Sequence, residues 1–221
     1  MSRVIPRKFV GADWRVWPEQ ICRSGWTKIF DLPVEAPLRL HVDIGFGGGE
    51  FLTGLARRNP EARFVGIEIS FKRVLKLARR LARTELRNIR LIGSDAAWVA
   101  QEGFEDDSVS VFWINFPDPW PRRRHGPRRL IEPRFVRQLA RKLATGGSLH
   151  LATDHPDYAE VIGSVLAGER LLENVSAPTP YRCERPDAVP TTYQRAWDAQ
   201  GRSCRFFHYR RVKSSVVRRP G

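Results

Sequence analysis

Four acidic residues lie at or just past the ends of short runs of β-forming residues, and their positions suggest a shared site. They are Asp43, Glu68, Asp95 and Asp118. If the runs are parallel strands of one sheet, their carboxyl ends meet at the edge where open α/β sheets bind ligands. Four carboxylates there would attract a cationic ligand and repel a pyrophosphate. Each acid could instead cap the helix that follows it, but that explanation is weaker for all four together.

Asp118 lies in the segment NFPDPWPRRRHGPRR, which begins at Asn115. Pro117 and Pro119 restrict the backbone on both sides of the acid and remove two N–H donors. A stiff loop holds a reacting group in productive geometry, so Asp118 is the candidate catalytic residue. The alternative is a proline-rich turn in which Trp120 is an ordinary core side chain.

A glycine-rich segment, DIGFGGGE, starts at Asp43. Gly45 and Gly47 allow a sharp turn and let a ligand approach the backbone at a helix N-terminus. Glu68 follows roughly 20 residues later, where an acid can bind ribose hydroxyls. Both dinucleotides and S-adenosylmethionine carry such hydroxyls. The incomplete dinucleotide fingerprint and the four acids favour the cationic S-adenosylmethionine.

Alternating strands and helices would position these residues. Strand-like runs cover 38–44, 63–69, 88–94, 108–116 and 148–153, and EFLTGLARR, FKRVLKLARRLA, PRFVRQLARKLA and DYAEVIGSVLAG have helical periodicity. The alternation predicts a mostly parallel, doubly wound α/β sheet of the Rossmann-like type. The run RFFHYRRV (205–212) is predicted to add an antiparallel C-terminal edge strand.

Length and composition favour one domain whose partner is a polyanion. The 221 residues are 42% hydrophobic, and 38 Lys and Arg against 24 Asp and Glu give a formal net charge of +14. We expect a basic N-terminal extension (1–35), a catalytic core (36–212) and a basic tail (213–221). The charge favours nucleic acid as a partner, with mere solubility as the alternative.

Several classes of protein are disfavoured. Neither a signal-peptide h-region nor an apolar run long enough to span a bilayer is present, so we expect a cytoplasmic protein that does not bind membranes. The three cysteines, Cys22, Cys183 and Cys204, are far apart in the sequence. Because they form no Cys-x-x-Cys pair, neither a zinc site nor a disulfide framework is indicated, and no metal is expected.

These motifs together resemble the bacterial tRNA (guanine-N7-)-methyltransferase family. The segments that carry the resemblance are DIGFG, GIE, FPDPWPRRRH, ATDHPDYA and TTYQ, which extend from Asp43 to Gln194. The FPDPW block with its basic continuation is the most specific of them. The resemblance implies a class I methyltransferase fold, S-adenosylmethionine as donor, and N7 of a guanine in the tRNA variable loop as acceptor.

The resemblance also implies roles for individual residues. The cofactor would lie against Asp43, Gly45, Gly47, Glu68, Asp95 and Asp118, with Asp118 also catalytic. The substrate-contact positions of the family fall on Arg122, Asp154, Thr191, Tyr193 and Gln194. The sequence departs from the family pattern at Asp43 and Gln194, where the family usually has Glu, at Arg122, where it has Lys, and in the N-terminal segment.

The expected chemistry depends on geometry more than on proton removal. Guanine N7 has a free lone pair at neutral pH, and transfer leaves positive charge on the purine. A carboxylate from Asp118 or Asp154 that accepts hydrogen bonds from the guanine N1–H and N2–H edge would hold the base and stabilise that charge. Trp120 or Tyr193 could stack on a base that has left its own stack.

The basic run after the loop is expected to contact phosphates around the target base. Its arginines are Arg122, Arg123, Arg124, Arg128 and Arg129. A solvated loop is the alternative for this run. The basic residues of the second predicted helix, 72–83, are interpreted as an ordinary solvated face.

Three other functions are compatible with parts of the sequence. A methyltransferase of the same fold could act on an exocyclic amine or a protein side chain, and Asn115 with the proline-rich loop fits such a site loosely. An RNA-binding protein with a vestigial cofactor site is supported only by Gln194 and the N-terminal departures. A nicotinamide oxidoreductase is disfavoured because four acids would repel its pyrophosphate.

Overall fold

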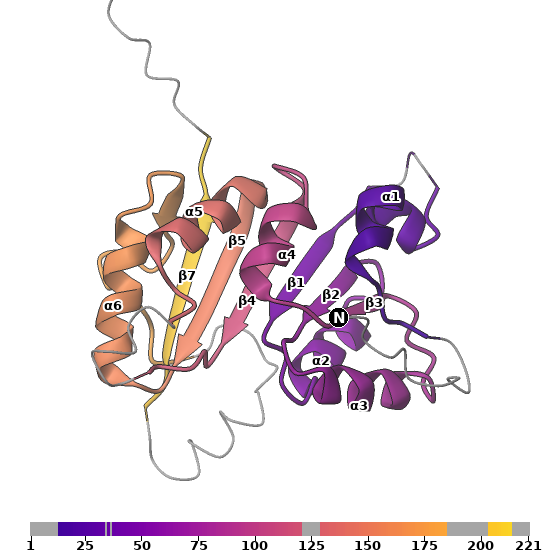
Figure 1. Ribbon diagram of the computed structural model, residues 1–221. Helices are drawn as coiled ribbons and strands as arrows, with labels where there is room; N and C mark the ends of the chain where they lie inside the picture. Colours follow the sequence, from indigo (N-terminus) through magenta and orange to yellow (C-terminus); the bar gives the residue numbers. More distant parts are fainter. Residues whose placement is uncertain (1–12, 34, 36, 121–128, 185–202, 214–221) are drawn as a thin grey trace, which may run out of the picture.

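A seven-stranded sheet forms the centre of the protein. The computed structural model describes residues 13–33, 35, 37–120, 129–184 and 203–213. The strands follow the order β3-β2-β1-β4-β5-β7-β6 across the sheet (Figure 1). Their bounds are β1 (Leu40–Ile44), β2 (Arg63–Ile67), β3 (Ile89–Ile92), β4 (Val109–Asn115), β5 (Leu143–Thr153), β6 (Leu172–Asn174) and β7 (Arg205–Arg211).

The first five strands are parallel, and the last pairings are antiparallel. In the register of the central pair, Ile44 of β1 stands opposite Ile114 of β4. β7 runs antiparallel to β5, and the short β6 extends the sheet beyond it. The predicted mostly parallel sheet with an antiparallel C-terminal strand is confirmed. Because the strand order reverses between β1 and β4, the sheet has its switch point there, where a crevice forms at the carboxyl ends.

In the described part of the chain, six helices cover the two faces of the sheet. They are α1 (Pro18–Ile29), α2 (Glu50–Arg58), α3 (Phe71–Leu81), α4 (Ala96–Glu102), α5 (Pro133–Lys142) and α6 (Pro156–Ala167). The apolar residues of α2 and α3 pack in one cluster with residues of β2, β3 and β4. Those of α1, α4, α5 and α6 belong to the larger cluster on the opposite face (Figure 1).

Part of the expected N-terminal extension is integrated into the fold. The Trp26 ring stacks on Phe104 at 5.5 Å between centroids, and its indole N–H donates to the Gly103 carbonyl at 2.7 Å. The Val16 N–H donates to the carbonyl of Leu91, a residue of β3, at 2.8 Å. Trp26 lies in α1, a helix that was not expected from the sequence because Gly25, at φ 66°, interrupts its periodicity.

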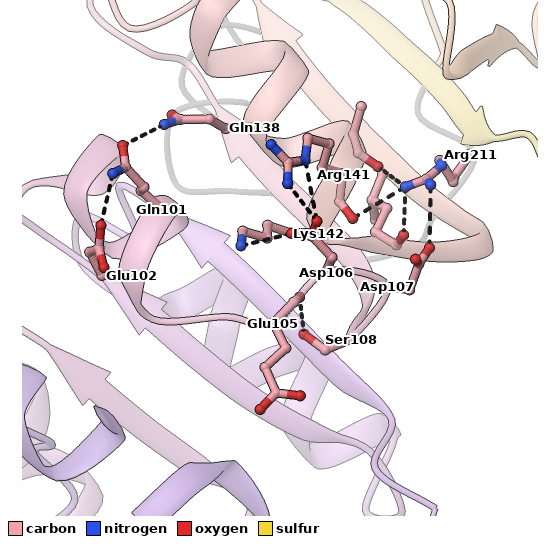
Figure 2. Close-up of polar contacts among 12 residues, drawn as sticks. Gln101, Glu102, Glu105, Asp106, Asp107, Ser108, Gln138, Arg141, Lys142 and Arg211 are labelled. Carbon is pink, nitrogen blue, oxygen red and sulfur yellow. Dashed lines mark hydrogen bonds and ion pairs between the residues drawn. The ribbon is translucent and has the colours of Figure 1, made fainter. Parts of the chain in front are cut away.

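The amino-terminal edge of the sheet is tied together by ion pairs. Asp106 lies between Arg141, at 2.8 Å, and Lys142, at 2.9 Å (Figure 2). Hydrogen bonds from Lys142 and Arg141 hold the pKa of Asp106 below its ordinary value. Arg211 pairs with Asp107 at 3.3 Å and donates to backbone carbonyls at the end of α5. Acids at this edge therefore serve the fold.

Candidate active site

A cleft opens at the carboxyl ends of β1 to β4. It consists of two adjoining pockets, with volumes of about 250 and 140 Å³. Their combined size is at the lower end of the range for ligand pockets, roughly 300–1,000 Å³. The residues that line both pockets are Gly45, Arg73, Asn115, Phe116 and Asp118.

All four carboxylates predicted from the sequence line this cleft. Asp43, with 3% of its surface exposed, lines the smaller pocket. Glu68, with 4% exposed, and Asp95 line the larger pocket, and Asp118 lines both. The structure therefore brings together acids that are separated by up to 75 positions, from Asp43 to Asp118. Unlike Asp106 and Asp107, they face a space that a ligand could fill.

Glu68 organises the glycine loop as well as lining the larger pocket. One carboxylate oxygen accepts from the Gly47 N–H at 3.1 Å, and the other accepts from the Ser70 N–H at 2.9 Å. Gly45 and Gly47 have φ values of 74° and 56°, which glycine adopts without strain. A Cβ at Gly45 would meet no atom within 4 Å, so the loop has open space beside it.

Asp95 both caps a helix and lines the cleft, the two roles that the sequence left open. Its side chain accepts a hydrogen bond from the Trp98 N–H at 2.9 Å and so caps α4. The same residue is exposed and lines the larger pocket. Helix capping therefore explains its position at the end of β3 without removing it from the cleft.

The loop that carries Asp118 is strained at both ends. Phe116 and Trp120 are not glycines, yet their φ values are 53° and 41°. Such conformations cost about 1–3 kcal/mol each and persist where the surrounding structure enforces them. Asp118 lies between them and is exposed toward both pockets. The prolines made a stiff loop predictable, whereas the two left-handed residues gave no signal in the sequence.

The predicted substrate-contact residues are placed only in part. Asp154 follows β5 directly and is half-buried, but it lines neither pocket of the cleft. Arg122, Thr191, Tyr193 and Gln194 lie outside the described residues. The same is true of most of the basic run, 121–128.

Arg73 is a cleft residue that the sequence analysis assigned to a solvated helix face. It lies in the first turn of α3, lines both pockets, and approaches Glu68 to 3.5 Å. Its position could have been inferred, because the first turn of a helix that follows a parallel strand lies at the carboxyl edge of the sheet.

The chain matches known methyltransferases in sequence. Residues 38–206 match the model of a family described as "Putative methyltransferase". The chain is 37% identical over 195 residues to the tRNA (guanine-N(7)-)-methyltransferase of Thermotoga maritima, an alignment that covers 88% of this chain and 59% of that protein. It is 42% identical over 170 residues to the protein of the same name from Leifsonia xyli, with coverages of 76% and 74%.

Solved structures with similar folds are also methyltransferases. The 16S rRNA methyltransferase KamB superposes with a TM-score of 0.59 at 17% identity, covering 80% of this chain and 90% of that one. A mutant 16S rRNA (adenine(1408)-N(1))-methyltransferase from Catenulisporales acidiphilia, solved with its cosubstrate SAM, gives 0.60 at 17% identity, with coverages of 92% and 94%. At this identity the likeness establishes the fold alone. The family match and the sequence identities establish more: this chain belongs to the tRNA (guanine-N(7)-)-methyltransferase family.

Proposed function

We propose that the protein transfers a methyl group from S-adenosylmethionine to N7 of a guanine in the variable loop of tRNA. The observation that carries the proposal is the placement of Asp118. Its strained loop occupies the switch point of the sheet and faces both pockets of the cleft. Family membership supplies the acceptor, because the curated relatives are tRNA (guanine-N(7)-)-methyltransferases.

The residues of the cleft fit this methyl donor. S-adenosylmethionine supplies a methyl group activated by a positively charged sulfur. Oε1 of Glu68 accepts one backbone N–H and retains a lone pair for a ribose hydroxyl, whereas Oε2 accepts from the Gly47 N–H and, at 3.5 Å, from Arg73. Asp95 lies where it can accept from an amine on the purine, and Asp43 where it can pair with an ammonium group. The open space beside Gly45 allows close approach to the backbone.

The acceptor side requires positioning of the guanine. Because N7 carries a free lone pair, the chain needs no general base for the attack. Asp118 is exposed at the cleft and would accept hydrogen bonds from the guanine N1–H and N2–H edge. Its negative charge would stabilise the positive charge that develops on the purine during transfer. Asp154, at the end of the neighbouring strand β5, is the second candidate for this contact.

The remaining contacts that we assign to the tRNA are made by residues outside the described part of the chain. We assign Arg122, Thr191, Tyr193 and Gln194 to the tRNA on the family pattern, and Gln194 would contact the base without the charge of the usual Glu. The formal net charge of +14 supports a polyanionic substrate. We assign catalysis to residues 36–212 of a single domain, which would act in the cytoplasm, where tRNA is modified.

Identification of the methylated nucleoside tests this function. The full chain is incubated with unmodified tRNA and S-adenosylmethionine, and the digested RNA is analysed by mass spectrometry against standards. N7-methylguanosine is the expected product. Another methylated nucleoside would reject the acceptor but keep the donor, and failure to bind S-adenosylmethionine would reject both. A tRNA with the variable-loop guanines replaced is the matched control and should yield no product.

A further inference from the structure

The two prolines of the Asp118 loop do not by themselves account for its shape. Pro117 and Pro119 have no N–H to donate, and the flanking residues Phe116 and Trp120 adopt unfavourable φ values. A strained segment keeps its shape only when surrounding groups hold it, and the backbone carbonyls of this loop are groups that can be held by hydrogen bonds from outside. Those partners show what fixes Asp118.

Arg129 supplies donors to two of these carbonyls. Its Nε donates to the Pro119 carbonyl at 2.9 Å, and its Nη2 donates to the Trp120 carbonyl at 3.4 Å. Both bonds are charge-assisted, and the planar guanidinium fixes their relative direction. Arg129 thus joins the end of the Asp118 loop to the segment that leads into α5.

Tyr158 in turn fixes Arg129. The guanidinium carbon lies 5.2 Å from the centre of the Tyr158 ring, in cation–π geometry. The Tyr158 side chain is fully buried on α6, and its hydroxyl accepts from the Ile131 N–H at 3.3 Å. Tyr158 therefore contacts both the Arg129 guanidinium and the backbone at Ile131, two residues further along the chain.

The electrostatics of the tyrosine agree with this arrangement. Burial raises the pKa of the Tyr158 hydroxyl, and the Asp118 charge raises it further, whereas the Ile131 N–H and the Arg129 charge oppose the shift. The hydroxyl therefore stays neutral at physiological pH. Asp118 and Arg129 are both close enough to Tyr158 for their charges to influence its pKa.

We infer that Arg129 and Tyr158 form a latch that holds the 116–120 loop in its strained shape and so sets the position of Asp118. The inference rests on the proposed function for the catalytic role of Asp118. Arg129 acts through the loop, so it is a positioning residue. The sequence analysis assigned Arg129 to a phosphate contact; in the structure its Nε and Nη2 donate to the loop carbonyls.

The two roles of Arg129 predict different kinetics. Arg129→Met keeps the aliphatic stem but removes the donors and the charge. If Arg129 is a latch, kcat at saturating tRNA and S-adenosylmethionine falls roughly 10- to 100-fold, because a small misplacement of a reacting group has effects of this size. The Kd for tRNA then changes less than about twofold. A phosphate contact would instead weaken tRNA binding and flatten its salt dependence, with kcat retained, and that result would overturn the latch.

Two further variants separate positioning from simple loss of structure. Arg129→Lys keeps the charge above Tyr158 but not the two-pronged donor, and it should recover part of the lost kcat. Arg134→Met, an exposed arginine on α5 with no hydrogen bond to the loop among the described contacts, is the matched control and should turn over like the wild type. Equal losses in Arg129→Met and Arg134→Met would contradict a specific role for Arg129.

Hydrogen exchange gives a readout that does not depend on activity. The Phe116 N–H donates to the Ala152 carbonyl at 2.8 Å, and the Ile131 N–H donates to Tyr158. Both amides should exchange faster in Arg129→Met, and the Ile131 amide should also exchange faster in Tyr158→Phe. Unchanged exchange at both amides would reject the latch. If the wild type produces no N7-methylguanosine, the proposed function fails, whereas the exchange result still decides whether Arg129 orders the loop.

Discussion

Single residues at the cleft are arranged for function at the expense of stability. Phe116 and Trp120 each adopt a left-handed conformation, which costs about 1–3 kcal/mol, and Asp118 lies between them. Asp43 and Glu68 are almost fully buried carboxylates at the same edge. Strain and buried acids of this kind are found where a site must be organised before the ligand arrives.

Replacement of Asp118 by asparagine tests this assignment at the level of one side chain. Asp118→Asn keeps the shape of the side chain and removes its charge. Under the proposed function, the purine cation that forms during transfer would lose its counter-charge. We expect the rate of transfer to fall roughly 10²- to 10³-fold. The melting temperature should stay close to that of the wild type, because Asp118 is exposed.

Initial rates and thermal melts of two variants check the prediction. Glu105→Gln, at an exposed position before β4 and so at the opposite edge of the sheet, removes the same charge away from the cleft and is the control. Full turnover by Asp118→Asn would remove this residue from the mechanism.

The sequence predicted some of these residues and not others for a physical reason. The four acids were predictable because parallel strands bring their carboxyl ends to one edge, whatever the packing of the helices. The left-handed conformations of Phe116 and Trp120 were not, because such conformations go against local preference and depend on the surrounding tertiary structure.

At the scale of elements, the close approach of α2 and α3 depends on one glycine. Gly49 begins α2 at φ 78°, and a Cβ there would stand 2.4 Å from a methyl group of Leu77 on α3. The glycine loop that lines the cleft is therefore positioned by the same residue that lets the two helices pack. A larger side chain would have to displace the Leu77 side chain, push α3 away or move the loop.

Alanine at Gly49 should cost more stability than alanine at another left-handed glycine. Gly146 has a similar φ of 81°, but a Cβ there would meet nothing within 4 Å. Both substitutions strain the backbone by about 1–2 kcal/mol. Gly49→Ala also overpacks the contact with Leu77, which adds about 1–3 kcal/mol.

Urea denaturation of the two variants measures the difference directly. Equal losses of unfolding free energy would mean that Leu77 moves aside without penalty. A larger loss in Gly146→Ala would contradict the packing argument.

Element prediction succeeded where the pattern was long and local. α3 and α5 show regular apolar spacing over ten or more residues, and both were predicted. α4 spans only seven residues, and β6 has three residues whose pairing with β7 joins distant parts of the chain. Such short elements are stabilised by tertiary contacts and leave little periodicity in the sequence.

The charge of the whole molecule is distributed in a way that its total does not reveal. The formal net charge is +14, yet four carboxylates line the cleft. At the opposite edge of the sheet, Asp106 and Asp107 are paired with cations. A polyanion would therefore be attracted by the molecule but repelled by the cleft itself, so that its phosphates bind around the cleft while a base enters it.

This distribution predicts that the position of a positive charge matters for tRNA binding, and not only the number of charges. Replacing Arg122, Arg123 and Arg124 by alanine should weaken binding and reduce the slope of log Kd against log salt by about 2, since each lost phosphate contact contributes roughly 0.7–0.9. The control replaces Lys76, Arg79 and Arg83, which are exposed on α3 or directly after it and lie beyond its first turn. Both triple variants lower the formal charge by three from +14, so they weaken the long-range field equally. Filter binding at several salt concentrations should therefore show a flattened slope for the loop variant and a nearly unchanged slope for the helix variant. If both slopes flatten equally, attraction comes from the field of the whole molecule, and the basic run is a solvated surface.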